Sequence, residues 1–360
     1  MATKPLISDY LVPPGLYVRE ALEHYGMTQA ELAERTGRPT QAISEIVNAK
    51  KEITKETAFE LEAVLGTPAH VWLNLECTYR YGLEAKHHAA RLAEQVAQSE
   101  NYPYSELAKL GWVTASRNKS ERVGYLLSYF GVAHLDLVKT NYSAAFRKSV
   151  KKEPSPYCLA AWLRIGERLA EKIDLPPYDK EALKRALPEL RRATRTSTDV
   201  VLALQIILHY AGVAFVIAPH LTKTYANGAV FWHGSRPVIL MSIRGAYEDV
   251  FWFTLFHELG HILLHEKSAT FIEGLGMQSD EEKEADEFAC NTLIPQEIWL
   301  QFRQNRKYDM RSVENFSRDQ EISPAIVVGR LMHDDSAFDG YHTLRRLRRQ
   351  LTFVPTHPKS

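Results

Sequence analysis

The 360-residue chain contains little cysteine and no long apolar run. Its three cysteines, Cys77, Cys158 and Cys290, are odd in number and far apart, which argues against a disulfide framework and against a cysteine zinc site. No run of about 18 apolar residues occurs, so we expect neither a membrane-spanning helix nor a membrane partner. The first residues lack the apolar core of a secretory signal, and we therefore expect a cytoplasmic protein.

The chain also has no excess of either charge, because 44 basic side chains balance 44 acidic ones. A net charge of zero neither supports nor excludes a nucleic-acid partner until the charge is divided by region. The hydrophobic fraction of 45% and the charged fraction of 24% are ordinary for a globular protein. At this length we expect two or three domains.

An almost wholly apolar segment contains the most informative motif, His257-Glu258-Leu-Gly-His261. On a helix, positions four apart share a face, so both imidazoles can reach one metal ion, and Glu258 can contact the water held by that metal. This arrangement is typical of zinc hydrolases and predicts a Zn²⁺ cofactor, with Glu258 as the catalytic base. The alternative is a pair of core histidines satisfied by backbone carbonyls.

A zinc site of this kind needs a third protein ligand. An acidic segment downstream has apolar residues at helical spacing, and Ser279 or Asp280 can cap its start. We expect Glu282 to be the third ligand, and Asp286, on the same face, to accept a hydrogen bond from the far nitrogen of a ligand histidine. Glu284 is the second choice as ligand, and the remaining acids only favour the start of a helix.

His265 continues the row formed by the two motif histidines. Three histidines in that row span two turns, roughly 12 Å, which is too far for one ion. We therefore interpret His265 as a supporting or surface residue. The group that stabilises the oxyanion is left open among Tyr225, His220 and His233.

Residues 15–75 predict a compact helical unit. Thr28 and Glu31 form a capping box at the start of one helix, Gly37 makes a turn, and a second helix covers 40–48. Two short helices around a glycine-containing turn are a helix-turn-helix arrangement. The candidate DNA contacts on and after the second helix are Thr40, Gln41, Ser44, Asn48, Lys50 and Lys51.

Regional charge limits this interpretation. Residues 1–80 hold eight basic against eleven acidic side chains, a net charge of −3, whereas 35–55 hold five against two, a net charge of +3. A local basic strip is sufficient for phosphate contacts. A helix-turn-helix used only for dimerisation or protein contact remains the alternative.

The N-terminal pattern resembles the Xre-type helix-turn-helix, and closely the variety found in HigA-type antitoxins. The resemblance covers about 5–80 and rests on Gly-Met-Thr-Gln-Ala-Glu-Leu-Ala at 26–33, Ile-Ser-Glu-Ile-Val-Asn at 43–48 and the Lys50-Lys51-Glu-Ile-Thr segment. It implies a DNA-binding homodimer that acts on an operator as a transcriptional regulator.

Residues between this unit and the histidine motif read as helices followed by three short strands. Helices are expected at 85–97, 117–131, 157–173, 178–187 and 197–209, with a linker at 151–156. Strands are expected at 213–217, 229–233 and 237–241, separated by Asn227-Gly228 and Gly234-Ser235 turns. An edge strand of such a sheet can pair with a peptide and lay it across the metal. The basic tail 341–360 is either a solvated helix face or a second phosphate contact.

Residues 200–335 resemble the ImmA/IrrE family of metallopeptidases. The resemblance rests on Phe253-Thr-Leu-Phe-His-Glu-Leu-Gly-His-Ile-Leu-Leu-His265, on Glu282-x-x-Ala-Asp-x-Phe-Ala289 and on Leu293-Ile-Pro295. It implies His257, His261 and Glu282 as ligands and Glu258 as base, although the family often has Asn where this chain has Asp286. It also implies a protein substrate, such as a repressor or a toxin–antitoxin component.

Together these patterns predict a mainly α protein with a small β-sheet, an α+β fold. The expected divisions are a helix-turn-helix domain at 1–80, a helical connecting region at 81–196, a zincin-like metallopeptidase domain with a three-stranded sheet at 197–335 and a basic tail at 336–360. The expected function is a DNA-binding regulator with a zinc endopeptidase domain. The alternative is a HigA-type antitoxin or repressor whose second domain binds or senses without efficient catalysis, and autocleavage near 150–156 is a third possibility.

Overall fold

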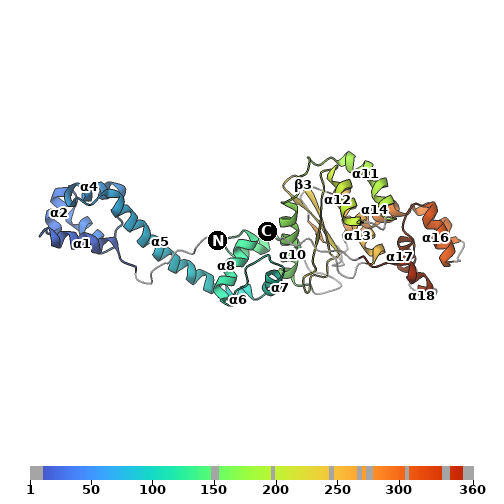
Figure 1. The fold of residues 1–360 in the computed structure, drawn as a ribbon, viewed down its shortest axis with the longest axis horizontal. Helices are drawn as coiled ribbons and strands as arrows, with labels where there is room; N and C mark the ends of the chain where they lie inside the picture. The colour runs from blue at the N-terminus through green and yellow to red at the C-terminus, as the bar shows by residue number, and fades with distance from the viewer. Residues whose placement is uncertain are drawn as a thin grey trace. The chain divides into compact units, whose positions relative to one another are not determined.

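The computed structural model describes residues 11–146, 154–195, 199–242, 247–265, 270–272, 279–304, 308–334 and 341–351. The chain divides into two compact units, Met1–Gln95 and Val96–Ser360 (Figure 1). Most described residues are helical, and one small sheet lies in the second unit, so the α+β class is confirmed. Within the described residues, no helix is both long enough and apolar enough to cross a bilayer.

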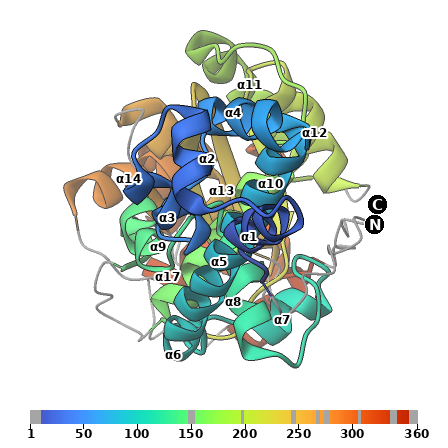
Figure 2. The ribbon, with the colours of Figure 1, turned by 90° about the vertical axis from the view of Figure 1, so that its left-hand side faces the viewer.

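The first unit is built from four short helices and one long helix. These are α1 (Pro14–His24), α2 (Gln29–Thr36), α3 (Thr40–Val47), α4 (Lys55–Leu65) and α5 (Ala69–Glu94). Helices α1–α4 pack around one small core, in which α2 contacts α3 (Figure 2). The residues in this core include Leu32, Ala33, Ile43, Ile46 and Leu61.

Local signals in this unit act as the sequence predicts. The Thr28 hydroxyl accepts the Glu31 N–H while the Glu31 carboxylate accepts the Thr28 N–H, which confirms the capping box. Gly37 ends α2 in the left-handed region at φ 67°. Helix α5 begins at Ala69 and not at residue 85, where the sequence predicts a helix to start. It continues without a break through residue 80, where we expected one region to end.

The second unit begins with a helical part. It contains α6 (Val96–Ser99), α7 (Tyr104–Lys109), α8 (Lys119–Phe130), α9 (Asp136–Asn141), η1 (Ser143–Phe146), α10 (Pro156–Ala170), α11 (Lys180–Ala193) and α12 (Val200–His209). Gly131 caps α8 in the left-handed region, where the sequence predicted that helix to end. The Ser155 hydroxyl caps α10, and positions 151–153 of the predicted linker lie outside the described residues.

In the described part of the chain, the sheet has four strands rather than the expected three. In the order β1-β3-β2-β4, it contains β1 (Ala214–Ala218), β3 (Arg236–Ser242), β2 (Gly228–His233) and β4 (Phe271–Ile272). Strands β1 and β3 are parallel, and β2 is antiparallel to both β3 and β4. Strand β4 was missed because two residues are too short to show an alternating pattern. Gly228 was assigned to a turn but is the first residue of β2, paired with Met241.

Helices cover both faces of the sheet (Figure 1). On one face Leu240 points at Gly166 of α10, where an added Cβ would lie 2.6 Å from the leucine. Neighbouring strand residues point to opposite faces, and Ile239 and Met241 join the core formed with α13 (Glu248–Leu264). Helices α14 (Asp280–Leu293) and α17 (Pro324–Asp334) pack on α13, and α16 (Met310–Asp319) packs on α17. Helix α15 (Gln296–Gln304) adds Trp299 to the same core.

The basic C-terminal segment contains α18 (Tyr341–Leu344) and η2 (Arg345–Leu347). The residues that follow η2 contact the start of α13. Arg348 pairs with Asp249 at 2.8 Å, and these side chains are only 12% and 8% exposed. The Glu248 N–H donates to the Arg349 carbonyl at 2.9 Å, and the Arg349 guanidinium pairs with the Glu248 carboxylate. The expectation of a solvated face or a phosphate contact is therefore wrong for Arg348, which is paired with Asp249, whereas the Arg349 side chain is 55% exposed.

Candidate metal centre and DNA-binding helix

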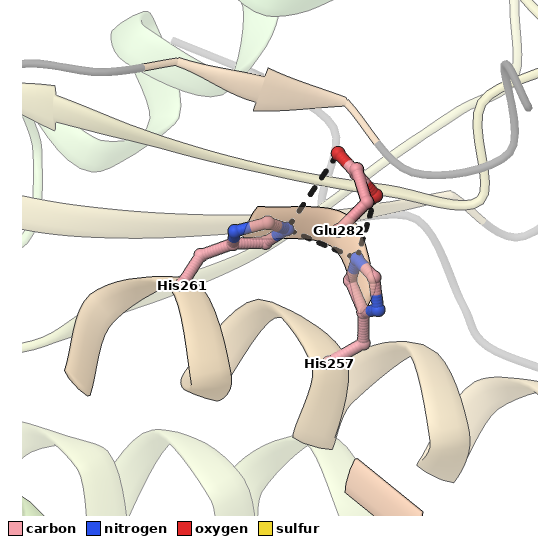
Figure 3. Close-up of side chains that lie close together, drawn as sticks. All are labelled: His257, His261 and Glu282. Carbon is pink, nitrogen blue, oxygen red and sulfur yellow. Dashed lines mark hydrogen bonds and ion pairs between the residues drawn. The ribbon is translucent and has the colours of Figure 1, made fainter. Parts of the chain in front are cut away.

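Helix α13 carries both motif histidines into the interior. Fourteen of its seventeen residues are buried, and the side chains of His257 and His261 are almost inaccessible. Their positions four residues apart place them one above the other on a single face. The two Nε2 atoms face each other at 3.0 Å (Figure 3). A direct hydrogen bond between them needs one nitrogen to donate and the other to accept, whereas a bound metal ion would take both as ligands.

The carboxylate of Glu282 closes the group from α14. The Ser279 hydroxyl caps this helix and so fixes where Glu282 lies in its first turn. Glu282 Oε2 is 3.2 Å from His257 Nε2, and Oε1 is 3.8 Å from His261 Nε2 (Figure 3). One ligand atom from each of the three side chains lies within 4.8 Å of the other two. The structure thus brings together the three residues that the sequence singled out as ligands.

Close packing of the two helices makes this approach possible. A Cβ added at Gly260 would lie 3.1 Å from Ala285 Cα and 3.1 Å from Phe288 Cδ1. These distances are tighter than ordinary carbon contacts, so a larger residue would push α14 away from α13. Gly260 therefore sets the separation at which Glu282 meets the histidines.

The donor set fits a zinc ion. Tetrahedral coordination at about 2.0–2.1 Å separates two ligand nitrogens by roughly 3.3 Å, close to the Nε2–Nε2 distance of 3.0 Å. Glu282 Oε1 is buried and makes no hydrogen bond with any described residue, so this oxygen lacks the partner that a buried carboxylate requires. Two imidazoles and one carboxylate are the ligands of a catalytic zinc site with room for a water molecule.

Asp286 orients the first histidine. Its Oδ1 accepts a hydrogen bond from His257 Nδ1 at 2.8 Å, which directs Nε2 of that ring toward the other ligand atoms. Burial by itself lowers the pKa of His257, but the hydrogen bonds to Asp286 and Glu282 and the charge of Glu258 outweigh it and raise the pKa to about 10.

The second histidine has a different environment. His261 Nδ1 lies 2.9 Å from His265 Nδ1, and His265 Nε2 lies 3.2 Å from a Glu284 carboxylate oxygen. The ring of Phe271, in β4, stacks on the His261 ring with centroids 3.9 Å apart. Burial, together with the neighbouring His257 and His265, lowers the pKa of His261, so this ring is neutral. His265 thus has the supporting role, and Glu284, the second choice as ligand, contacts His265 instead.

Glu258 is fully buried under the first residue of β2. A Cβ added at Gly228 would lie 2.8 Å from Glu258 Oε1 and 2.6 Å from Thr254 Cγ2, so only glycine lets the strand come this close. Gly228 and Phe271 are site residues that sequence reasoning missed. The glycine was visible in the sequence, but its role depends on a contact across 30 positions of the chain.

The three candidates for oxyanion stabilisation lie at different positions relative to Gly228, the residue above Glu258. His233 is exposed at the far end of β2, which at about 3.3 Å per residue lies roughly 16 Å from Gly228. His220 Nδ1 bonds to the Thr224 hydroxyl at 2.8 Å. Tyr225 lies three positions before Gly228 in the left-handed region at φ 54°. His233 is therefore too distant, and Tyr225 is the nearest of the three along the chain.

The candidate DNA contacts lie on α3 and in the segment that follows it. Thr40, Gln41 and Asn48 of α3 and its C-cap are exposed, whereas Ser44 is half-buried. The Gln41 amide donates to the Glu45 carboxylate at 3.0 Å, and the Asn48 amide donates to the Ser44 carbonyl at 2.8 Å. Lys50 and Lys51, which follow α3, are also exposed.

A buried His-Glu-x-x-His helix with an acid from the next helix defines a metallopeptidase-like centre, joined in this chain to a helix-turn-helix unit. Comparison with protein families agrees with both parts. A helix-turn-helix family matches residues 18–72, and the IrrE N-terminal-like domain of the M78 peptidases matches residues 211–332. The chain therefore combines an Xre-like helix-turn-helix DNA-binding domain with an IrrE-like domain of the M78 peptidase family.

Individual relatives cover smaller parts of the chain. Virulence-associated protein A of Dichelobacter nodosus is 40% identical over 70 residues, which make up 18% of this chain and 67% of that protein. The solved structure of an addiction module antidote protein of a HigA family from Coxiella burnetii is 28% identical. That match covers 24% of this chain and 94% of the antidote protein, with a TM-score of 0.23.

Proposed function

We propose that this protein is a cytoplasmic, DNA-binding transcriptional regulator whose second unit is a zinc-dependent endopeptidase. Its substrate would be a repressor or antitoxin-type protein in a stress, phage or toxin–antitoxin response. One observation carries the enzymatic part, namely the convergence of His257, His261 and Glu282 beside the buried Glu258. The match to the M78 peptidases supports the same reaction class.

The residues around this centre have distinct parts in peptide hydrolysis. His257, His261 and Glu282 would hold a zinc ion, which would supply an acidified water molecule and polarise a peptide carbonyl. Glu258 accepts the proton of that water and returns it to the leaving amine. The Glu258 carboxylate packs closely under Gly228. This contact restricts the movement of the carboxylate and so fixes the position of the base.

Strand β4 offers a place for the substrate backbone. It is an edge strand among the described residues, and its Phe271 ring covers His261. An extended peptide that adds to a sheet edge places its carbonyls at fixed intervals along that edge. A peptide paired with β4 would therefore run past the histidine ligands, which suits cleavage of an unfolded or loop segment.

The DNA-binding part of the proposal rests on α3. Gln41 and Asn48 carry amides that can bond to base edges, and Lys50 and Lys51 can contact phosphates. A helix-turn-helix of this size usually binds as a homodimer to two half-sites. Gln41→Ala should weaken operator binding by about 1–3 kcal/mol, whereas Lys50→Ala should weaken binding to all sequences and reduce its salt dependence. Operator binding unchanged in the Gln41→Ala, Ser44→Ala double variant would remove DNA recognition from α3.

One experiment separates a peptidase from a silent binding domain. Zinc content and cleavage are measured for the full chain and its Glu258→Gln variant, with the protein products of neighbouring genes as substrates. We expect both proteins to hold one zinc and only the unaltered chain to cleave. Normal cleavage by Glu258→Gln would refute the mechanism. Zinc binding without cleavage of any substrate would favour the antitoxin-like alternative.

A further inference from the structure

A pocket of about 220 Å³ lies beside the metal centre, between α13, the end of α14 and α17. Its walls are mainly apolar and include Val250 and Phe253 of α13, Leu293 of α14 and Ile326 of α17. None of the three candidate ligands and no atom of Glu258 lines it. The pocket is therefore distinct from the metal centre, and its occupant need not contact the zinc ion.

Two helix faces lead from the metal centre to this pocket. Phe253 precedes His257 by one turn, and the centroids of their rings are 6.3 Å apart. On α14, Cys290 lines the pocket one turn after Asp286, the partner of His257. One helical turn advances about 5.4 Å, and an extended peptide advances about 3.3–3.6 Å per residue. The pocket thus lies within one or two peptide residues of a bond cleaved at the metal.

The charged groups at the pocket wall already have partners. Arg330 donates to the carbonyls of Cys290 and Ile294 and to the Gln296 side chain. Asp249 is paired with Arg348. Neither residue can therefore form a new ion pair with a charged ligand group. Desolvating such a group in the pocket would cost free energy that no ion pair with these residues offsets.

One polar atom of the wall has no such partner. The Thr254 side chain is 1% exposed and lines the pocket, and its hydroxyl makes no hydrogen bond with any described residue. Mainly apolar walls, with Arg330 and Asp249 already paired, suit an uncharged guest about the size of a leucine or phenylalanine side chain.

We propose that this pocket receives a large apolar side chain of the peptide substrate, at a position within two residues of the cleaved bond. The inference rests on the proposed function, because it assigns a substrate class to the same centre. It predicts that substrates are cut beside leucine, methionine or phenylalanine and not beside acidic residues.

Binding can be measured without turnover. The full-length, zinc-loaded Glu258→Gln protein is titrated with dipeptide hydroxamates whose side chain next to the hydroxamate is isobutyl, benzyl, methyl or carboxymethyl. We expect the isobutyl and benzyl probes to bind at least about tenfold more tightly than the methyl probe, because they bury three or more additional carbons. The carboxymethyl probe should bind most weakly.

A pocket-filling variant tests where the preference arises. Val250 is 38% exposed, so Val250→Trp can fill the pocket with little disturbance of the fold, whereas Leu202→Trp on α12 alters a 52% exposed residue outside the pocket. Val250→Trp should abolish the preference for large side chains, and Leu202→Trp should retain it. Equal binding of the isobutyl and methyl probes, or a preference that survives Val250→Trp, would overturn the pocket assignment.

The outcomes distinguish failure of the pocket from failure of the proposed function. Cleavage by the zinc-loaded chain without side-chain preference keeps the peptidase and refutes the pocket. Selective binding of the large probes without cleavage keeps the pocket and refutes turnover. A chain that binds no zinc refutes both. Tight binding of free N-acetylleucine amide to zinc-free protein would instead identify a small-molecule site, and so refute the substrate role.

Discussion

His261 and His265 face each other through their Nδ1 atoms at a distance of 2.9 Å. One ring must donate to the other, and His265 in turn contacts Glu284 through Nε2. A ligand histidine is commonly oriented by a carboxylate or a carbonyl, so a second histidine in that place is a distinctive feature of this centre. A carboxylate is still part of this arrangement, because Glu284 contacts His265 and not the ligand histidine itself.

His265→Ala should weaken zinc binding by about 10- to 100-fold, because it removes the group that orients the His261 ring. His265→Asn, which keeps a polar group beside His261, should lose less. Competition with a zinc chelator measures the affinity of each variant. Glu284→Ala is the companion variant and should have a smaller effect than His265→Ala. Unaltered affinity in His265→Ala would show that Phe271 stacking alone holds the ring.

Zinc binding near neutral pH should release about one proton. Without metal, the pKa of His257 is raised to about 10, so the ring is charged at pH 7.5 and must lose its Nε2 proton to bind zinc. The pKa of His261 is lowered, so that ring contributes none. Zinc affinity should consequently rise with pH up to the pKa of His257 and fall below it.

Calorimetric titration in buffers of different ionisation enthalpy counts these protons. Asp286→Asn is the comparison variant, because it gives a neutral acceptor to the hydrogen bond that contributes most to raising the pKa of His257. That variant should release fewer protons at the same pH. Equal proton release by both proteins would contradict the role given to Asp286.

Gly228→Ala should reduce peptide cleavage by about tenfold or more while zinc content stays the same. The added methyl group would meet the Glu258 carboxylate and the Thr254 methyl, so the base has to move from its position. Gly234→Ala is a suitable control in the same strand pair, because no atom lies within 4 Å of the added carbon. Gly234 has φ +63°, so this control should cost about 1 kcal/mol of stability and leave activity unchanged. Full activity in Gly228→Ala would show that Glu258 tolerates displacement.

Arg348→Met should lower the free energy of unfolding by about 3 kcal/mol, because it leaves the Asp249 carboxylate buried without its partner. Urea denaturation followed by the fluorescence of the buried tryptophans measures the change. The double variant Arg348→Met, Asp249→Asn should recover most of the loss, since no buried charge then remains. A double variant as unstable as the single one would indicate that packing of Arg348 on Tyr247 is the larger contribution.

Residues that act through local spacing were predictable from the sequence. The four-residue interval between His257 and His261 places both rings on one helix face whatever surrounds the helix. The capping box of Thr28 and Glu31 is equally local. The prediction of Glu282 as a ligand came from the need for a third one. Asp286 was predicted beside it because it lies four residues later, on the same helix face.

Features that depend on contacts between distant segments were not predictable. Strand β4 pairs only two residues with β2, and neither residue carries a strand pattern of its own. The glycine at position 228 resembles a turn residue until α13 is placed beneath it. The basic C-terminal segment looked like a solvated surface because its acidic partners lie about 100 positions earlier. In each case the decisive partner is remote in sequence.

The pairing of Arg348 with Asp249 has a consequence for protein synthesis. Asp249 lies in the first turn of the helix that carries both motif histidines, and its partner is translated 99 positions later. At roughly 5–20 residues per second, the ribosome needs several seconds to cover that interval. During that time the nascent helix lacks the segment that neutralises its first turn, whereas the helix-turn-helix unit is already complete. The two units of this protein should therefore fold in sequence, with the helix-turn-helix unit first and the unit that holds the candidate metal centre last.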